Sequence, residues 1–253
     1  MVESTQINRD TADEPTEGIS AVDRRTLLVA TAGLAGFAGC TSGSFGGDGG
    51  SCDEGFAVEG PDGNTHCVEA VESDRSITEY YRYDTKTQNS SALADGIEAV
   101  DATVAFVYRN ASTDDLSLVV VHDSPDGGSG GSVAMTFEGV DQTEWLVKDD
   151  PEPRSSSEVY ESPEETSDDS ISVIWGWSGS SSLTDGGAIG PLGDSFDISV
   201  THHQEATVGN TTTNRVGIDR WLFVDGANLD SPIELASFDN GSGDVSVQLS
   251  TTS

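Results

Sequence analysis

Apolar and polar residues alternate with a period of two in many short segments of this chain. In the stretch ISVIWGW, the residues Ile171, Val173, Trp175 and Trp177 fall on one face, and the segment 195–203 repeats the pattern. Strict alternation is typical of a half-buried β-strand. Ten segments are predicted as strands on this basis: 77–83, 102–109, 116–122, 132–138, 144–148, 171–177, 195–203, 219–226, 232–238 and 244–250.

Turn residues separate these segments, and no convincing amphipathic helix lies among them. The pattern predicts an all-β fold, an antiparallel β-sandwich of about ten strands. The expected core anchors are Trp145, Trp175, Trp177 and Trp221. An acidic stretch rich in Pro and Ser, 149–170, is predicted as a loop.

The first forty residues follow a different pattern. Arg24 and Arg25 precede a weakly apolar run, 27–39, that ends at Cys40. Thirteen residues are too few for a spanning helix, which needs about 20. A pair of arginines before such a run is the twin-arginine export signal, and FAGC (37–40) has the form of a lipobox, in which Cys40 is lipidated. The alternative, a buried helix ending in a structural cysteine, is disfavoured by three glycines within the run.

The sequence therefore predicts three parts: a signal peptide with lipobox at 1–40, a flexible Gly/Ser-rich tether at 41–51 and a single β-sandwich domain at 52–253. With Cys40 lipidated, Cys52 and Cys67 remain as a pair. An exported protein meets an oxidising exterior, so we expect a disulfide between them. A metal pair is the alternative, although neither cysteine belongs to a CxxC motif.

Composition points to a saline environment. The chain has 11 Lys+Arg against 45 Asp+Glu, a formal net charge of -34. Self-repulsion at this charge destabilises a compact fold in dilute buffer, whereas molar salt shortens the Debye length to roughly 3 Å. Disorder is the rival interpretation of high charge, and the regular alternation argues against it. The charge also argues against nucleic acid or an anionic membrane surface as direct partners.

Taken together, Arg24, Arg25, the 37–40 lipobox and the scarcity of lysine resemble the twin-arginine-exported surface lipoproteins of haloarchaea. The resemblance implies export in a folded state and attachment by lipid to the outer face of the cytoplasmic membrane. It implies no activity.

Motifs for catalysis and transition metals are weak. Gly127, Ser129 and Gly131 fit the GxSxG pattern, but no helix is predicted after the serine, as a nucleophile elbow requires. His202 and His203 are adjacent in a predicted strand and therefore point to opposite faces. We assign no catalytic residue. The numerous carboxylates supply any separation that glycoside hydrolysis needs, so they are not evidence for it.

Calcium and glycans are the remaining candidates. Asp126 and Asp185 lie in Asp-Gly stretches read as oxygen-rich turns, and they are the weak candidates for structural calcium. No other cofactor is expected. Four N-x-S/T sequons are candidate glycosylation sites in predicted turns: Asn89, Asn110, Asn210 and Asn240.

Two functions remain open at this point. The first is a non-catalytic binding or structural module of the cell envelope, with an envelope protein or a glycan as partner. The alternative is a membrane-anchored hydrolase of an extracellular polymer. If exposed, the tyrosines of the 77–83 segment could stack on sugars. Alternation puts Tyr81 and Tyr83 on one face and Tyr80 on the other, and at least one face must be core, so half-buried packing is the default expectation.

Overall fold

The computed structural model describes residues 52, 55–82, 93, 95–124, 127–141, 143–148, 164–178, 184–238 and 243–251. All of them belong to one compact unit. Within these residues, no helix has the length and apolar character needed to cross a membrane.

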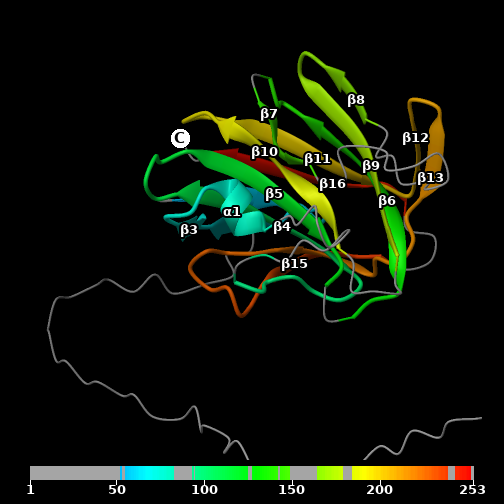
Figure 1. Ribbon diagram of the computed structural model, residues 1–253, viewed down its shortest axis with the longest axis horizontal. Coiled ribbons are helices and arrows are strands. Elements are labelled where there is room, and N and C mark those ends of the chain that lie inside the picture. Colours follow the sequence, from blue (N-terminus) through cyan, green and yellow to red (C-terminus); the bar gives the residue numbers. More distant parts are fainter. Residues whose placement is uncertain are drawn as a thin grey trace, which may run out of the picture. The chain divides into compact units, whose positions relative to one another are not determined.

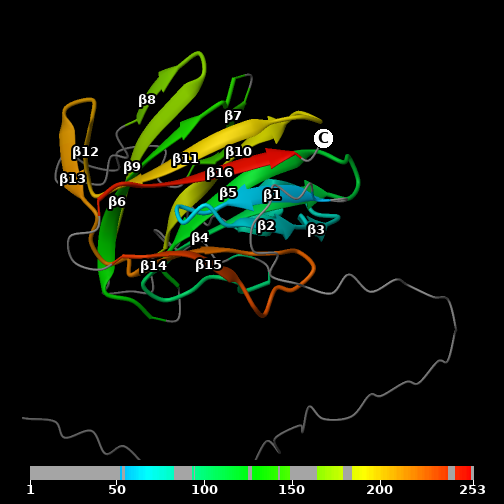
Figure 2. The same ribbon diagram turned by 180° about the vertical axis from the view of Figure 1, so that it is seen from behind.

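Two sheets form the sandwich (Figures 1 and 2). Sheet A contains, in spatial order, β2 (Thr65–Val68), β1 (Phe56–Glu59), β16 (Val245–Thr251), β11 (Asp197–His203), β6 (Gly130–Glu138), β9 (Ser170–Ser178) and β8 (Glu164–Ser167). Sheet B contains β15 (Ile233–Ser237), β14 (Arg220–Phe223), β4 (Ala102–Asn110), β5 (Leu116–His122), β10 (Asp185–Leu192) and β7 (Glu144–Lys148), with β3 (Val71–Ser73) beside β4. A separate hairpin consists of β12 (Glu205–Val208) and β13 (Thr211–Asn214).

The all-β fold class expected from the sequence is confirmed, since nearly every described element is a strand. Most neighbouring strands pair antiparallel. Two pairs differ, because β4 runs parallel to both β3 and β14.

The core between the sheets follows the alternation seen in the sequence. On β9, Ile171, Val173, Trp175 and Trp177 all point inward and are buried. Trp221 of β14 is buried in the same core. Burying large aromatic side chains supplies much of the hydrophobic stabilisation of such a fold.

Sheet B is buried on both faces, which explains the continuous apolar run of β5. Its outer face carries Val104, Phe106 and Val119, which form a second apolar cluster. The short helix α1 (Ile77–Tyr81) covers this face with Tyr80 and Tyr81 (Figure 1).

The prediction of a strand at 77–83 is wrong, because the helix α1 occupies most of this segment. Ser76 caps the helix: its Oγ accepts from the amide of Glu79, and the Glu79 carboxylate accepts from the amide of Ser76. This reciprocal capping box satisfies two amides of the first turn. Both Tyr80 and Tyr81 are fully buried, so neither is exposed for stacking on sugars. Tyr83 lies outside the described residues.

Several strands were not expected. The structure contains short strands at or next to the edges of sheet A, namely β1, β2 and β8, which are too brief to show a clear alternation. The prediction of a loop over 149–170 is wrong for the last part of this segment, where β8 forms a hairpin with β9. Residues 149–163 lie outside the described part.

Candidate functional site

Polar side chains cover the outer face of sheet A at β6, β9 and β11. Since Phe137, Val173 and His202 point into the core, their neighbours Thr136, Ser172 and His203 point outward. The β12–β13 hairpin covers part of the same face, packing Val208 and Ala206 against β6 and β9 (Figure 1).

Thr136, Ser172 and His203 form a continuous chain of hydrogen bonds with Asp244, which precedes β16. We call it the hydroxyl–histidine chain. The Asp244 Oδ2 atom lies 2.9 Å from Nδ1 of His203. The Nε2 atom of His203 lies 2.9 Å from Oγ1 of Thr136. Thr136 Oγ1 in turn lies 2.9 Å from Oγ of Ser172. The chain thus crosses β11, β6 and β9.

Asp244 fixes the orientation of the imidazole. Hydrogen bonds from the His203 ring and from the Gln204 amide hold the pKa of Asp244 below its usual value, so the carboxylate is ionised and acts as an acceptor. His203 therefore donates from Nδ1. In the neutral ring Nε2 is then an acceptor, and it receives the proton of Thr136.

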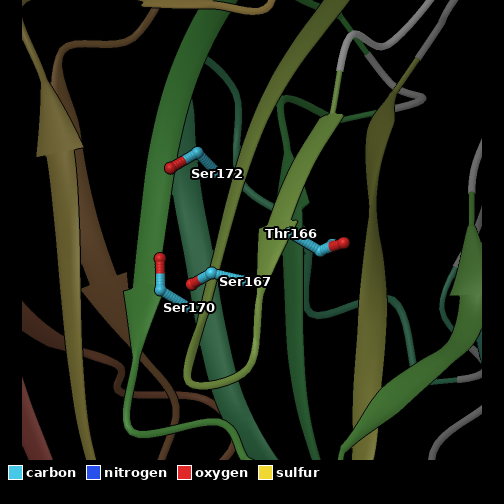
Figure 3. Close-up of a pocket in the computed structure, with 4 residues that line it drawn as sticks. All are labelled: Thr166, Ser167, Ser170 and Ser172. Carbon is cyan, nitrogen blue, oxygen red and sulfur yellow. The ribbon is translucent and has the colours of Figure 1, made fainter.

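A shallow depression of about 440 Å³ adjoins Ser172 at the β8–β9 hairpin. Thr166, Ser167, Ser170 and Ser172 line it. Figure 3 shows Ser167, Ser170 and Ser172 on the same side of the hairpin, while Thr166 points the other way. Ser172 is therefore both the end of the hydroxyl–histidine chain and part of the depression.

The distances in the chain match those of a base and a hydroxyl nucleophile, but the surroundings do not favour acyl transfer. Stabilising an oxyanion needs donors aimed at the reacting oxygen. In the described part, β6 lies between β11 and β9, and β9 lies between β6 and β8. The amides of both strands are thus directed into the sheet, parallel to its plane. These amides therefore do not point at a group bound above Ser172.

A second polar cluster lies inside the sandwich. Thr103 Oγ1 of β4 is 3.0 Å from His122 Nδ1 and 3.2 Å from His202 Nε2. All three side chains are fully buried. Burial lowers the pKa of His122 to about 3, and burial together with the neighbouring His122 lowers that of His202. Both rings are neutral and unreachable, so the cluster is structural.

Two aspartates near this cluster, Asp123 and Asp185, have buried carboxylates that accept hydrogen bonds. The Asp123 Oδ2 atom accepts from the indole Nε1 of Trp177 at 2.8 Å. Asp185 accepts from the amides of Gly176 and Gly186 at 2.7 and 2.8 Å. Asp185 was expected in an exposed turn, but it opens strand β10 and is buried.

The calcium hypothesis gains no support from these positions. Asp126 lies outside the described residues, and the Asp185 oxygens already bind backbone amides. No group of three or more His, Cys, Asp or Glu in the described part is arranged to hold a metal ion. His66 lies in β2 opposite Val58.

Of the export and disulfide residues, Arg24, Arg25 and Cys40 lie outside the described part. Cys52 and Cys67 form a disulfide, with 5.6 Å between their Cα atoms. It links the N-terminal end of the described chain to β2, an edge strand of sheet A.

Among the sequons, Asn89 and Asn240 also lie outside the described residues. Asn210 is exposed at the turn between β12 and β13. Asn110 differs from the expected turn position, because it is the last residue of β4 and its Oδ1 accepts from the Ser112 amide. Ser129 of the GxSxG pattern donates to Asp101 rather than to a histidine.

Comparison with known proteins adds no relative: no protein-family model matches the chain, and no curated protein sequence matches it.

Sequence reasoning did not find the hydroxyl–histidine chain. A partial signal was present, because Thr136, Ser172 and His203 occupy the polar positions of alternating strands. Their mutual contact depends on strand pairing between segments 36 and 67 residues apart.

Proposed function

We propose that this protein is a lipid-anchored, extracellular β-sandwich protein of halophilic type that acts as a non-catalytic binding or structural module of the cell envelope. In this proposal Arg24 and Arg25 direct export, and lipid on Cys40 attaches the protein to the outer face of the cytoplasmic membrane. The partner is an envelope glycan or protein, and the charge of -34 argues against nucleic acid.

The observation that carries the binding function is the polar outer face of sheet A. Its hydroxyl–histidine chain ends at the depression beside Ser172. Such convergent polar groups beside a concavity are typical of a binding site.

The position of this face also favours the proposal. The disulfide at Cys52 and Cys67 holds the tether end at β2, while the depression lies at β8 and β9. These are opposite edges of sheet A. At about 4.8 Å per strand they lie roughly 29 Å apart. A tether that leaves at one edge keeps the other accessible to partners.

The hydrolase alternative is supported by the spacing of Asp244, His203 and Thr136 alone. In the described part, the backbone amides of β6 and β9 point along the sheet and not toward a substrate at Ser172. The binding module is therefore the preferred function.

Cell fractionation tests the attachment. We expect the wild-type protein in the membrane fraction, the Cys40→Ser protein in the medium and an Arg24→Lys/Arg25→Lys double variant inside the cell. Continued membrane retention of Cys40→Ser would contradict the anchor.

Co-sedimentation with isolated envelopes in molar KCl tests the binding role, using the released Cys40→Ser protein. We expect it to sediment with the envelopes, and we expect Ser172→Trp, which fills the depression, to reduce this. Absence of sedimentation, or release of new reducing ends from an envelope polysaccharide, would contradict a non-catalytic binding module.

A further inference from the structure

We propose that the depression at the β8–β9 hairpin binds a neutral oligosaccharide, whose hydroxyl groups donate hydrogen bonds to Ser172. This inference rests on the proposed binding function and assigns its ligand class.

The first argument is the direction of the hydroxyl–histidine chain. When the His203 ring is neutral and its Nδ1 donates to Asp244, the Thr136 proton goes to Nε2. The Thr136 oxygen is then available only as an acceptor, so the proton of Ser172 goes to Thr136. The Ser172 oxygen is left with its lone pairs, and it requires a donor from the ligand.

The second argument is the lining of the depression. Its four residues all carry neutral hydroxyl groups, and they offer a ligand hydrogen bonds but no cation. Glu138 pairs with Ser170 and lies on the same face, so the nearest charge that the strand pairing places there is negative. An anionic ligand is therefore disfavoured. A hydroxylated neutral ligand fits, because short hydrogen bonds do not need long-range attraction and persist in salt.

Permethylated sugars provide the test, because methylation removes every hydroxyl donor and keeps the oxygen acceptors. The full-length protein is titrated calorimetrically in molar KCl at pH 7.5 with neutral tetrasaccharides of glucose, galactose and mannose. Each is compared with its permethylated form. We expect at least one tetrasaccharide to bind, and its permethylated form to bind about five-fold more weakly, as the loss of one hydrogen bond predicts.

Thr136→Val separates this mechanism from a general effect of the surface. The variant removes the Thr136 hydroxyl from the hydroxyl–histidine chain, so Ser172 no longer donates its proton to Thr136. The ratio of the affinities for the free and the permethylated sugar should then fall to nearly one. Thr201→Val is the matched control, since Thr201 binds Ser246 on the same face at 2.8 Å, outside the chain. Its preference should equal that of the wild type.

The inference is overturned if no tetrasaccharide binds the folded protein, if free and permethylated sugars bind equally at pH 7.5, or if Thr201→Val and Thr136→Val behave alike. Such results leave membrane attachment and envelope binding untouched, so they distinguish a wrong ligand class from a wrong proposed function.

Discussion

Thr103 on β4 and His202 on β11 join the two sheets through a hydrogen bond of 3.2 Å inside the sandwich. The same hydroxyl bonds to His122 at 3.0 Å. Because Thr103 has one proton for two rings, it donates to one imidazole and accepts from the other. The Nε2 atom of His122 is left without a hydrogen-bond partner. Burial disfavours the charged form of both rings and lowers their pKa values, so both histidines are neutral.

Stability should therefore decline in mild acid. Both buried histidines have a pKa lowered from 6.5, that of His122 to about 3, so the unfolded chain binds more protons than the folded one between these values. Below pH 6.5 each histidine should lower the free energy of unfolding by about 1.4 kcal/mol per pH unit. Urea unfolding between pH 7 and 5 measures the slope.

His202→Gln supplies the control for this prediction. Glutamine can bond to Thr103 but takes no proton, so the pH slope should fall by about half. An unchanged slope would show that His202 is not protonated on unfolding.

The second prediction concerns Asp123, whose carboxylate accepts from the amides of Asp101 and Ser124 and from Trp177. Asp123→Ala leaves these three donors without their acceptor, at about 1 to 3 kcal/mol for each donor that stays buried. We expect thermal denaturation to show a loss of about 3 kcal/mol or more. The exposed Asp194→Ala should change stability by less than about 0.5 kcal/mol, and equal effects would refute the role of Asp123.

The third prediction concerns the cap of α1. Ser76→Ala removes the oxygen that accepts from the Glu79 amide, and it should lower the free energy of unfolding by about 1 kcal/mol. Ser76→Asp restores an acceptor and should be nearly neutral. Urea midpoints of the two variants provide the comparison; an equal loss in both would argue against the cap.

The fourth prediction follows from the charge of -34. Raising KCl from 0.1 M to 3 M shortens the Debye length from about 10 Å to below 3 Å and screens the repulsion among carboxylates. The midpoint of thermal unfolding by circular dichroism should rise steeply across this range. Sucrose is the uncharged control and should produce a smaller rise. A midpoint independent of KCl would count against the halophilic interpretation.

Strands and the direction of their side chains could be predicted from the sequence where apolar residues alternate with polar ones and one strand face is buried. The segment 171–177 became β9 with its tryptophans inside, and His202 and His203 point to opposite faces as expected. Each of these predictions depends only on the two-residue period of a strand.

Other elements depend on contacts that a local pattern does not contain. Strand β10 has a Gly-rich sequence that resembles a turn, yet β5 and β7 pair with it on both sides. Tyr80 and Tyr81 favour a strand by propensity, but the Ser76–Glu79 capping box starts a helix, and this signal was overlooked.

The candidate site needed the register of three strands. Asp244 and His203 are 41 residues apart, and Thr136 and His203 are 67 apart. A shift of one residue in either pairing would turn these side chains to the other face. Their contact therefore became visible only in the folded structure.

The intact mass of the protein extracted from cell membranes is the most direct test of lipid attachment at Cys40. We expect a polypeptide that begins at Cys40 and carries the additional mass of a lipid. A polypeptide in the cytosol that still begins at Met1, with no lipid on Cys40, would contradict it.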